Sequence, residues 1–121
     1  MSWQAYADQI TNQGIANAAL YGWEGGAEWA KSANNAGTAA EAAKMIAHMK
    51  SNATGRVTYA GKDFITLRNT GEVLYGKLGA EGITAAKTGQ CLVVGMYDQN
   101  SQPGQCNNAV ENLAQYLVDN D

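Results

Sequence analysis

The chain has 121 residues, of which 45% are hydrophobic and 16% are charged, and its formal net charge is -3. This size and apolar content predict a single domain over residues 1–121 with one hydrophobic core. The charge excludes a basic field for nucleic acid, and the apolar runs are shorter than the ~20 residues of a membrane-spanning helix.

The N-terminal residues predict a short amphipathic helix. Ser2 can serve as its N-cap, Trp3, Tyr6 and Ile10 share one helical face, and Gly14 ends it. The same residues contain neither the positively charged segment nor the apolar stretch of a secretory signal. We therefore expect the protein in the cytoplasm.

A hairpin and a central helix follow. Residues 15–33 are small and β-compatible, with glycines around a tight reversal and Trp29 on the second strand. Thr38 and Glu41 have the spacing of a capping box, and the residues after them are good helix formers. This pattern predicts a helix of about three turns.

The second half of the chain predicts an antiparallel meander and a final helix. Five segments of β character are separated by turn signals, at 56–60, 64–68, 73–78, 83–87 and 91–97. Pro103-Gly104 ends the last strand, and Val110, Leu113 and Leu117 form the apolar stripe of a C-terminal helix. The order of elements predicts an α+β fold, with the terminal helices on one face of the sheet and the middle helix elsewhere.

Residues suited to catalysis or metal binding occur singly. His48 is the only histidine, and no nucleophile stands near it in the sequence. Cys91 and Cys106 are fifteen positions apart, which fits no zinc motif, and we expect both as reduced thiols. Residues 82–88 resemble a phosphate-binding loop but are one residue short and lack its second glycine. These patterns predict a binding protein without enzyme activity, metal or cofactor.

Four aromatic residues form the most informative pattern. Trp3 and Tyr6 lie near one end of the chain, Tyr116 lies near the other, and Trp29 is on an early strand. Each could be ordinary core packing, although full burial is hard to achieve so close to a terminus. If the terminal helices are neighbours, the rings form an exposed groove. Such a groove suits polyproline II ligands, because flat rings stack on proline and indole or phenol groups donate to its carbonyls.

Several sequence blocks resemble those of profilins, the small actin-monomer-binding proteins. The opening Ser2-Trp3-Gln4-Ala5-Tyr6 is similar to the family's first block. Later blocks follow in the family's order: Tyr75-Gly76-Lys77-Leu78-Gly79, Gly82-Ile83-Thr84, Lys87-Thr88-Gly89-Gln90, Gln102-Pro103-Gly104-Gln105-Cys106-Asn107 and the residues 110–117. The resemblance spans nearly the whole chain and is weakest from about Ala33 to Gly61.

The resemblance implies a profilin-like α+β fold, a central antiparallel sheet with both terminal helices on one face and a further helix on the other. It also implies two binding sites. The polyproline site would consist of Trp3, Tyr6, Trp29 and Tyr116, with Leu113 as a wall. The actin site would consist of Tyr75, Lys77, Thr84, Lys87, Gly104, Asn107, Asn108 and Asn112.

By the same resemblance the partners would be the actin monomer and proline-rich proteins such as formin-type elongators. The protein would regulate actin polymerisation, promote nucleotide exchange on actin and be associated with the cytoskeleton. With only eight lysines and arginines, we expect weak binding of phosphoinositide headgroups. The alternative is a profilin-like scaffold or tethering module with another protein partner, for which a lost aromatic groove would be the sign.

Overall fold

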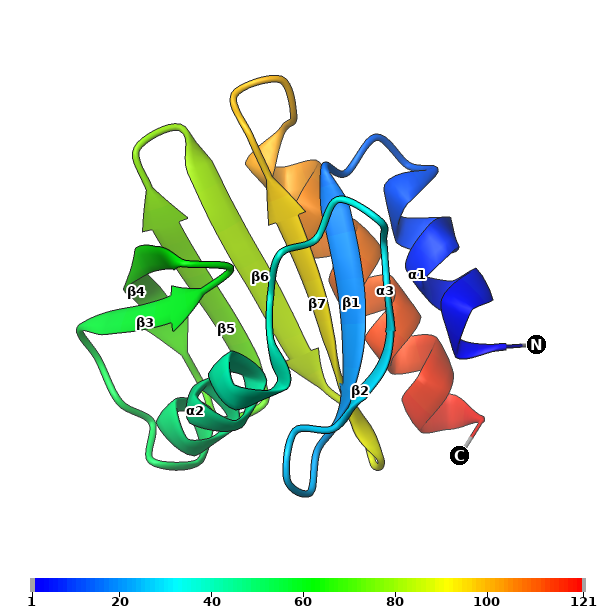
Figure 1. The fold of residues 1–121 in the computed structure, drawn as a ribbon, viewed down its shortest axis with the longest axis horizontal. Coiled ribbons are helices and arrows are strands. Elements are labelled where there is room, and N and C mark those ends of the chain that lie inside the picture. Colours follow the sequence, from blue (N-terminus) through cyan, green and yellow to red (C-terminus); the bar gives the residue numbers. More distant parts are fainter. Residues whose placement is uncertain (1, 121) are drawn as a thin grey trace.

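The computed structural model describes residues 2–120, in which three helices surround a seven-stranded antiparallel sheet (Figure 1). The helices are α1 (Trp3–Thr11), α2 (Ala39–Lys50) and α3 (Pro103–Asp119). The strands are β1 (Asn17–Gly22), β2 (Glu28–Lys31), β3 (Arg56–Tyr59), β4 (Lys62–Asn69), β5 (Val73–Leu78), β6 (Glu81–Lys87) and β7 (Cys91–Tyr97). The α+β fold expected from the sequence is confirmed.

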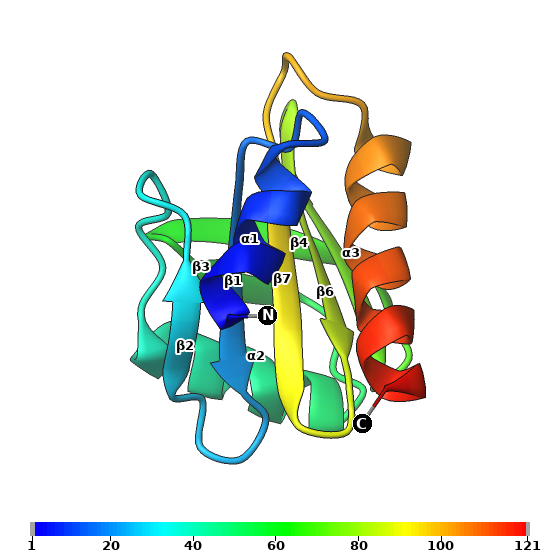
Figure 2. The ribbon, with the colours of Figure 1, turned by 90° about the vertical axis from the view of Figure 1, so that its right-hand side faces the viewer.

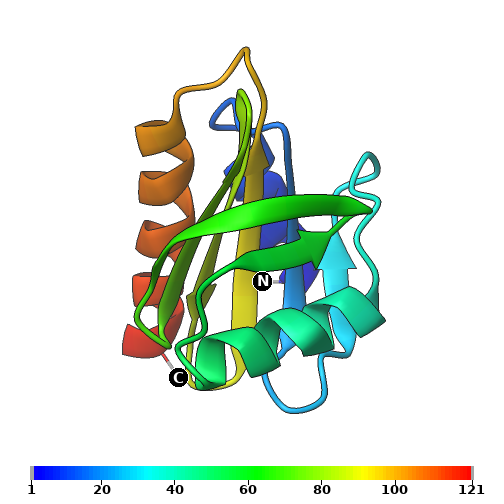
Figure 3. The same ribbon diagram turned by 90° about the vertical axis from the view of Figure 1, so that its left-hand side faces the viewer.

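The strand order is β2-β1-β7-β6-β5-β4-β3. The predicted meander from β3 to β7 and the N-terminal hairpin are both present. Chain patterning alone did not predict how they join: β1 pairs with β7 from Asn17↔Met96 to Gly22↔Cys91, so the hairpin extends the meander into one sheet. Helices α1 and α3 cover one face of this sheet and α2 covers the other (Figure 2). Strands β3 and β4 curl over α2 (Figure 3).

Local capping explains where the helices begin. The Ser2 hydroxyl accepts a hydrogen bond from the Ala5 N–H at 3.2 Å, and Thr38 and Glu41 form the predicted capping box. Pro103 is the first residue of α3, where its missing N–H costs nothing, and strand β7 already ends at Tyr97. The proline therefore begins the helix and does not end the strand, as was expected from the sequence.

The carboxylate of Glu41 also fastens α2 to the turn between β3 and β4. It accepts hydrogen bonds from the backbone N–H groups of Ala60 at 3.0 Å and Gly61 at 2.9 Å. Burial raises the pKa of Glu41, but these donors and the Thr38 N–H outweigh it, so the pKa lies below its ordinary value. Ala60 and Gly61 both have positive φ, as a two-residue hairpin turn with this twist requires.

Strand β7 is buried on both faces and divides the core in two. Val93 packs with α1 and α3, whereas Leu92 and Val94 pack with α2. A β-carbon on Gly95 would lie only 2.6 Å from Val110, so this glycine allows α3 to approach the sheet closely.

Cys91 and Cys106 are both buried, and no disulfide joins them. Burial raises the pKa of Cys106 to about 11. Within residues 2–120, no helix is long and apolar enough to cross a membrane.

Candidate functional site

The four predicted aromatic residues form one continuous row, which we call the aromatic groove. The Trp3 ring centroid lies 4.7 Å from that of Trp29 and 5.7 Å from that of Tyr6. Tyr6 is in turn 6.3 Å from Tyr116. Helix α1, strand β2 and helix α3 thus each contribute to a single surface, although their residues are far apart in the sequence.

The rings of the aromatic groove pack on the protein core on one side and are accessible on the other. Tyr116 is 51% exposed, while Trp3, Tyr6 and Trp29 are half-buried and pack on the core beneath α1 and α3. Gly22 leaves room for the Trp29 indole, because a β-carbon on Gly22 would lie 3.1 Å from the indole Nε1. An anchored ring keeps one face free for a ligand without losing much conformational entropy on binding.

Leu113 and Asn112 lie next to the groove in a pocket between α1 and α3, which we call the interhelix pocket. It has a volume of about 340 Å³ and shares Tyr6 and Tyr116 with the aromatic groove. Leu113 is only 6% exposed, so it forms the floor of this region and not the expected wall. Asn112 faces the same pocket and therefore points toward α1. This orientation separates Asn112 from the other residues expected to contact actin.

A second candidate surface lies on the other flank of α3, and we call it the sheet face. Its centre is the half-buried Tyr75 of β5, which is paired with Thr84 of β6. Thr84 was expected to contact actin, but it is 0% exposed and lies beneath this surface. The Tyr75 hydroxyl donates to Glu111 Oε2 at 2.5 Å, and the Thr84 hydroxyl donates to Asn107 Oδ1 at 2.5 Å. Burial and then the Glu111 carboxylate raise the pKa of Tyr75. These bonds connect α3 to the strands that carry the surface.

Lys77 extends the sheet face, because side chains two apart on a strand point the same way. It is exposed, and its partner across β4 is Ile65. Gly104 and Asn108 are exposed on the first turns of α3, and a β-carbon on Gly104 would meet no atom within 4 Å.

Lys87 does not join the sheet face. It lies opposite Leu92, whose side chain belongs to the core on the α2 side, and its Nζ lies 5.2 Å from the centroid of the Trp23 ring. Lys50 of α2 approaches the same ring at 5.6 Å. The expectation grouped Lys87 with Thr84, but the two are three positions apart on β6 and so point to opposite faces.

The sequence interpretation missed exposed apolar residues on β4. Ile65 is 49% exposed and Leu67 is 62% exposed, at the bulge where Arg68 comes opposite Tyr75. The signal was present in the sequence, because Phe64 and Ile65 cannot both point to the core of a strand with alternating side chains. Together with Lys77, these residues give the sheet face an apolar and cationic character.

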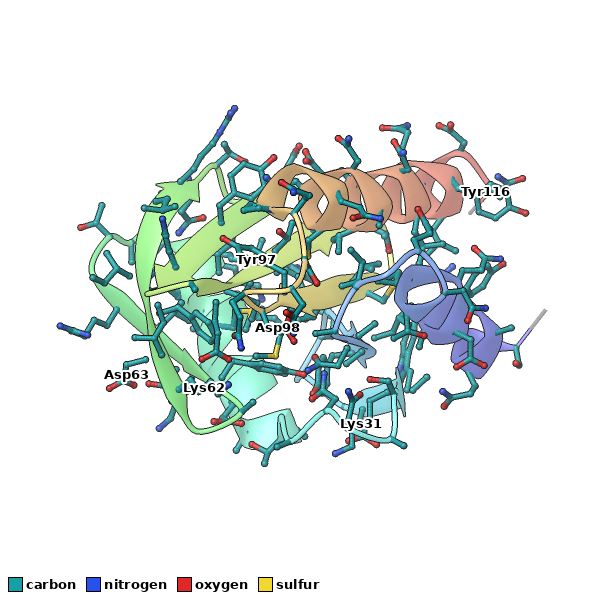
Figure 4. The ribbon with its side chains drawn as sticks, turned by 90° about the horizontal axis from the view of Figure 1, so that it is seen from above. Lys31, Lys62, Asp63, Tyr97, Asp98 and Tyr116 are labelled. Atoms are coloured by element: carbon teal, nitrogen blue, oxygen red, sulfur yellow. The ribbon has the colours of Figure 1, made fainter. Side chains whose placement is uncertain are left out.

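The two surfaces lie at different places along the molecule. Tyr116 projects near one end, whereas Lys62 and Asp63 at the start of β4 lie at the other (Figure 4). Helix α3 separates them: Asn107 and Glu111 contact the strands, and Tyr116 contacts α1. The two surfaces therefore lie on different flanks of α3.

Comparisons with known proteins agree along the whole chain. The family model described as Profilin matches residues 1–121. Profilin-2 of Dictyostelium discoideum is 41% identical, covering 99% of this chain and 98% of that protein. The solved structure of Acanthamoeba castellanii profilin IA superposes with a TM-score of 0.92 at 34% identity, covering 98% of both chains. Mouse profilin IIa, solved in complex with a double repeat from the FH1 domain of mDia1, has the same fold, with a TM-score of 0.74 at 22% identity over 99% of both chains.

Proposed function

The chain belongs to the profilin family, and we propose that it binds actin monomers through the sheet face and proline-rich peptides through the aromatic groove. Regulation of actin polymerisation by binding, without bond chemistry of its own, is the general function of this family. The observation that carries the proposal is the convergence of four rings from three separate elements into the aromatic groove.

Peptide binding follows from the chemistry of the groove. Proline lacks an N–H group, so a polyproline II helix presents carbonyls that need donors and flat ring faces that need apolar contacts. The indoles of Trp3 and Trp29 and the phenols of Tyr6 and Tyr116 provide both. Mouse profilin IIa, which has this fold, was solved with a double repeat from the FH1 domain of mDia1. The partners we propose are therefore proline-rich segments of formin-type elongators.

Actin binding is proposed for the sheet face because it combines a cation with exposed apolar area. Lys77 provides the charge, and Ile65 and Leu67 provide the apolar contacts. Tyr75, Gly104, Asn107 and Asn108 complete the surface, and the buried Thr84 supports it through its hydrogen bond to Asn107. A partner with acidic residues around an apolar centre complements this arrangement.

We further propose that the protein accelerates nucleotide exchange on actin. The effect would be allosteric, since the sheet face would bind the open form of the actin monomer more tightly than the closed form. Its site of action would be the cytoplasm, at the actin cytoskeleton. Binding of phosphoinositides would be weak, because Lys31 and Lys62 are paired with Glu28 and Glu81.

Two binding experiments test the proposal on the wild-type protein. Beads that carry polyproline should retain it, and labelled actin monomers should bind it in solution and release a fluorescent nucleotide faster. Retention on the beads without any affinity for actin would favour the alternative of a profilin-like tethering module. Actin binding without retention would remove the aromatic groove from the proposal.

A further inference from the structure

Strand β3 is at one end of the seven-stranded sheet, so one of its edges has no neighbouring strand in the described chain. The Thr66 N–H donates to the Gly55 carbonyl at 2.8 Å, which marks this pair as hydrogen-bonded. Bonded and non-bonded positions alternate in an antiparallel pair, so the backbone groups of Arg56 and Thr58 point away from β4. Two N–H groups and two carbonyls therefore face outward along the edge of β3.

A slot lies between this edge and α2, which runs along the side of β3 away from β4 (Figure 3). We call it the edge slot. It has a volume of about 500 Å³ and is lined by Glu41, Lys44 and His48 of α2 and by Arg56, Val57 and Thr58 of β3.

The edge slot is closed at both ends. At one end the Glu41 carboxylate binds the turn between β3 and β4, and at the other His48 Nε2 lies 2.9 Å from Thr66 Oγ1. Glu41 and His48 are seven residues apart on α2, or about 10 Å at a helical rise of ~1.5 Å per residue. An extended chain rises by ~3.3 Å per residue, so about three residues fit.

The charges beside the edge slot favour an anionic ligand. Lys44 and Arg56 are exposed, and neither forms an ion pair within residues 2–120. The carboxylates close to them already accept hydrogen bonds: Glu41 binds the turn, and Asp63 Oδ1 accepts from the Thr58 hydroxyl at 2.5 Å. The two cations are the charged groups left for a partner.

The backbone of β3 decides which kind of anion fits best. An ion such as phosphate only accepts hydrogen bonds, so it would leave the carbonyls of Arg56 and Thr58 without donors. An extended peptide both donates and accepts along its edge. Its residue opposite Val57 would point toward α2, because cross-strand neighbours share a face and Val57 packs with α2. An acidic side chain at this position would reach Lys44.

We propose that the edge slot is a docking site for a partner protein, in which an extended acidic segment adds to β3 as an antiparallel strand. The backbone hydrogen bonds would give affinity, and an aspartate or glutamate at the centre of the segment would give specificity. The edge slot is on the α2 side of the sheet, so this site depends on neither the aromatic groove nor the sheet face. It would allow the protein to bind a third partner.

The test uses blocked pentapeptides and the amide signals of ¹⁵N-labelled protein. Acetyl-Thr-Thr-Asp-Thr-Thr-amide should shift the Arg56 and Thr58 amides saturably and slow their exchange with solvent. The same peptide with asparagine at its centre should bind about fivefold more weakly, through loss of one exposed ion pair. Proline at the second and fourth positions keeps the aspartate but removes the two N–H groups that would donate to β3. This peptide should also bind at least about fivefold more weakly.

Two variants with the same change in charge locate the acidic side chain. Lys44→Glu should abolish binding of the aspartate peptide. Lys50→Glu makes the same change on an exposed residue of α2 outside the edge slot, and should keep binding within about twofold, the effect of a remote surface charge. Circular dichroism verifies that both variants are folded.

Each result either supports or overturns the docking site. If the proline-containing peptide binds as tightly as the aspartate peptide, the edge slot holds anions by charge alone and strand addition is wrong. Equal binding of the asparagine peptide, or equal losses in Lys44→Glu and Lys50→Glu, would refute the role of Lys44. If the Arg56 and Thr58 amides do not shift up to the solubility limit of the aspartate peptide, the docking site is wrong. None of these results bears on the binding of polyproline or actin.

Discussion

The aromatic groove and the sheet face are built in different ways and expose different kinds of side chain. The groove joins three elements through ring packing, and its side chains are neutral and half-buried. The sheet face consists of adjacent strands that two side-chain hydrogen bonds connect to α3, and it carries a cation beside exposed aliphatic residues. Because α3 borders both, one helix presents two chemically distinct surfaces. Substitutions on one surface should leave the other functional.

The largest effect is expected at the aromatic groove. Trp3→Ala removes the ring that contacts both Trp29 and Tyr6, so it interrupts the row at its middle. We expect affinity for decaproline to fall by about 3 kcal/mol, as for a central aromatic anchor. Actin affinity should stay unchanged. Titration of folded protein with both ligands checks this, and a parallel loss of actin binding would show that the two surfaces are coupled.

A smaller effect is expected when the charge on the sheet face is reversed. Lys77→Glu should weaken actin binding by about 2 kcal/mol if its contact is central, and should not affect decaproline. Lys44→Glu is the matched control, because Lys44 is an exposed residue of α2 on the opposite side of the sheet. Equal losses in the two variants would mean that net charge matters and the sheet face does not.

The sequence predicted the two surfaces unequally. Periodicity and capping located the helices, and the four rings of the aromatic groove came together as expected. Each ring is large and amphipathic and lies near an element that the local sequence defines. Lys87 and Asn112 were grouped with the sheet face but lie elsewhere. Whether a residue belongs to that face depends on which way its side chain points from the strand or helix. A one-residue difference in register reverses that direction, and the family's blocks do not specify it.

Ile65 shows a different kind of miss, because the sequence placed it in the β segment 64–68 and predicted no binding role for it. Ile65→Ser should weaken actin binding by about 1 kcal/mol, since half of the side chain remains available for burial by a partner. The unfolding midpoint should barely change, because exposed residues contribute little to stability. Val118→Ser is the control: Val118 is 47% exposed, much like Ile65 at 49%, but lies near the end of α3. If the control weakens actin binding equally, the apolar part of the sheet face is wrongly assigned.

The smallest effect is the response to salt, and it should separate the surfaces without any substitution. Decaproline is uncharged and the rings of the aromatic groove are neutral, so its dissociation constant should be constant as sodium chloride increases. The contact that Lys77 makes with an acidic partner should be screened, since the Debye length falls from about 30 Å at 0.01 M to about 10 Å at 0.1 M. With actin held monomeric, we expect affinity to fall by about threefold over this range, as for an exposed ion pair worth under about 1 kcal/mol. Lys77→Gln should lower this salt dependence and leave the decaproline measurement unchanged. A decaproline affinity that falls in parallel with that of actin would mean that charge contributes to both surfaces, and the contrast between them would not hold.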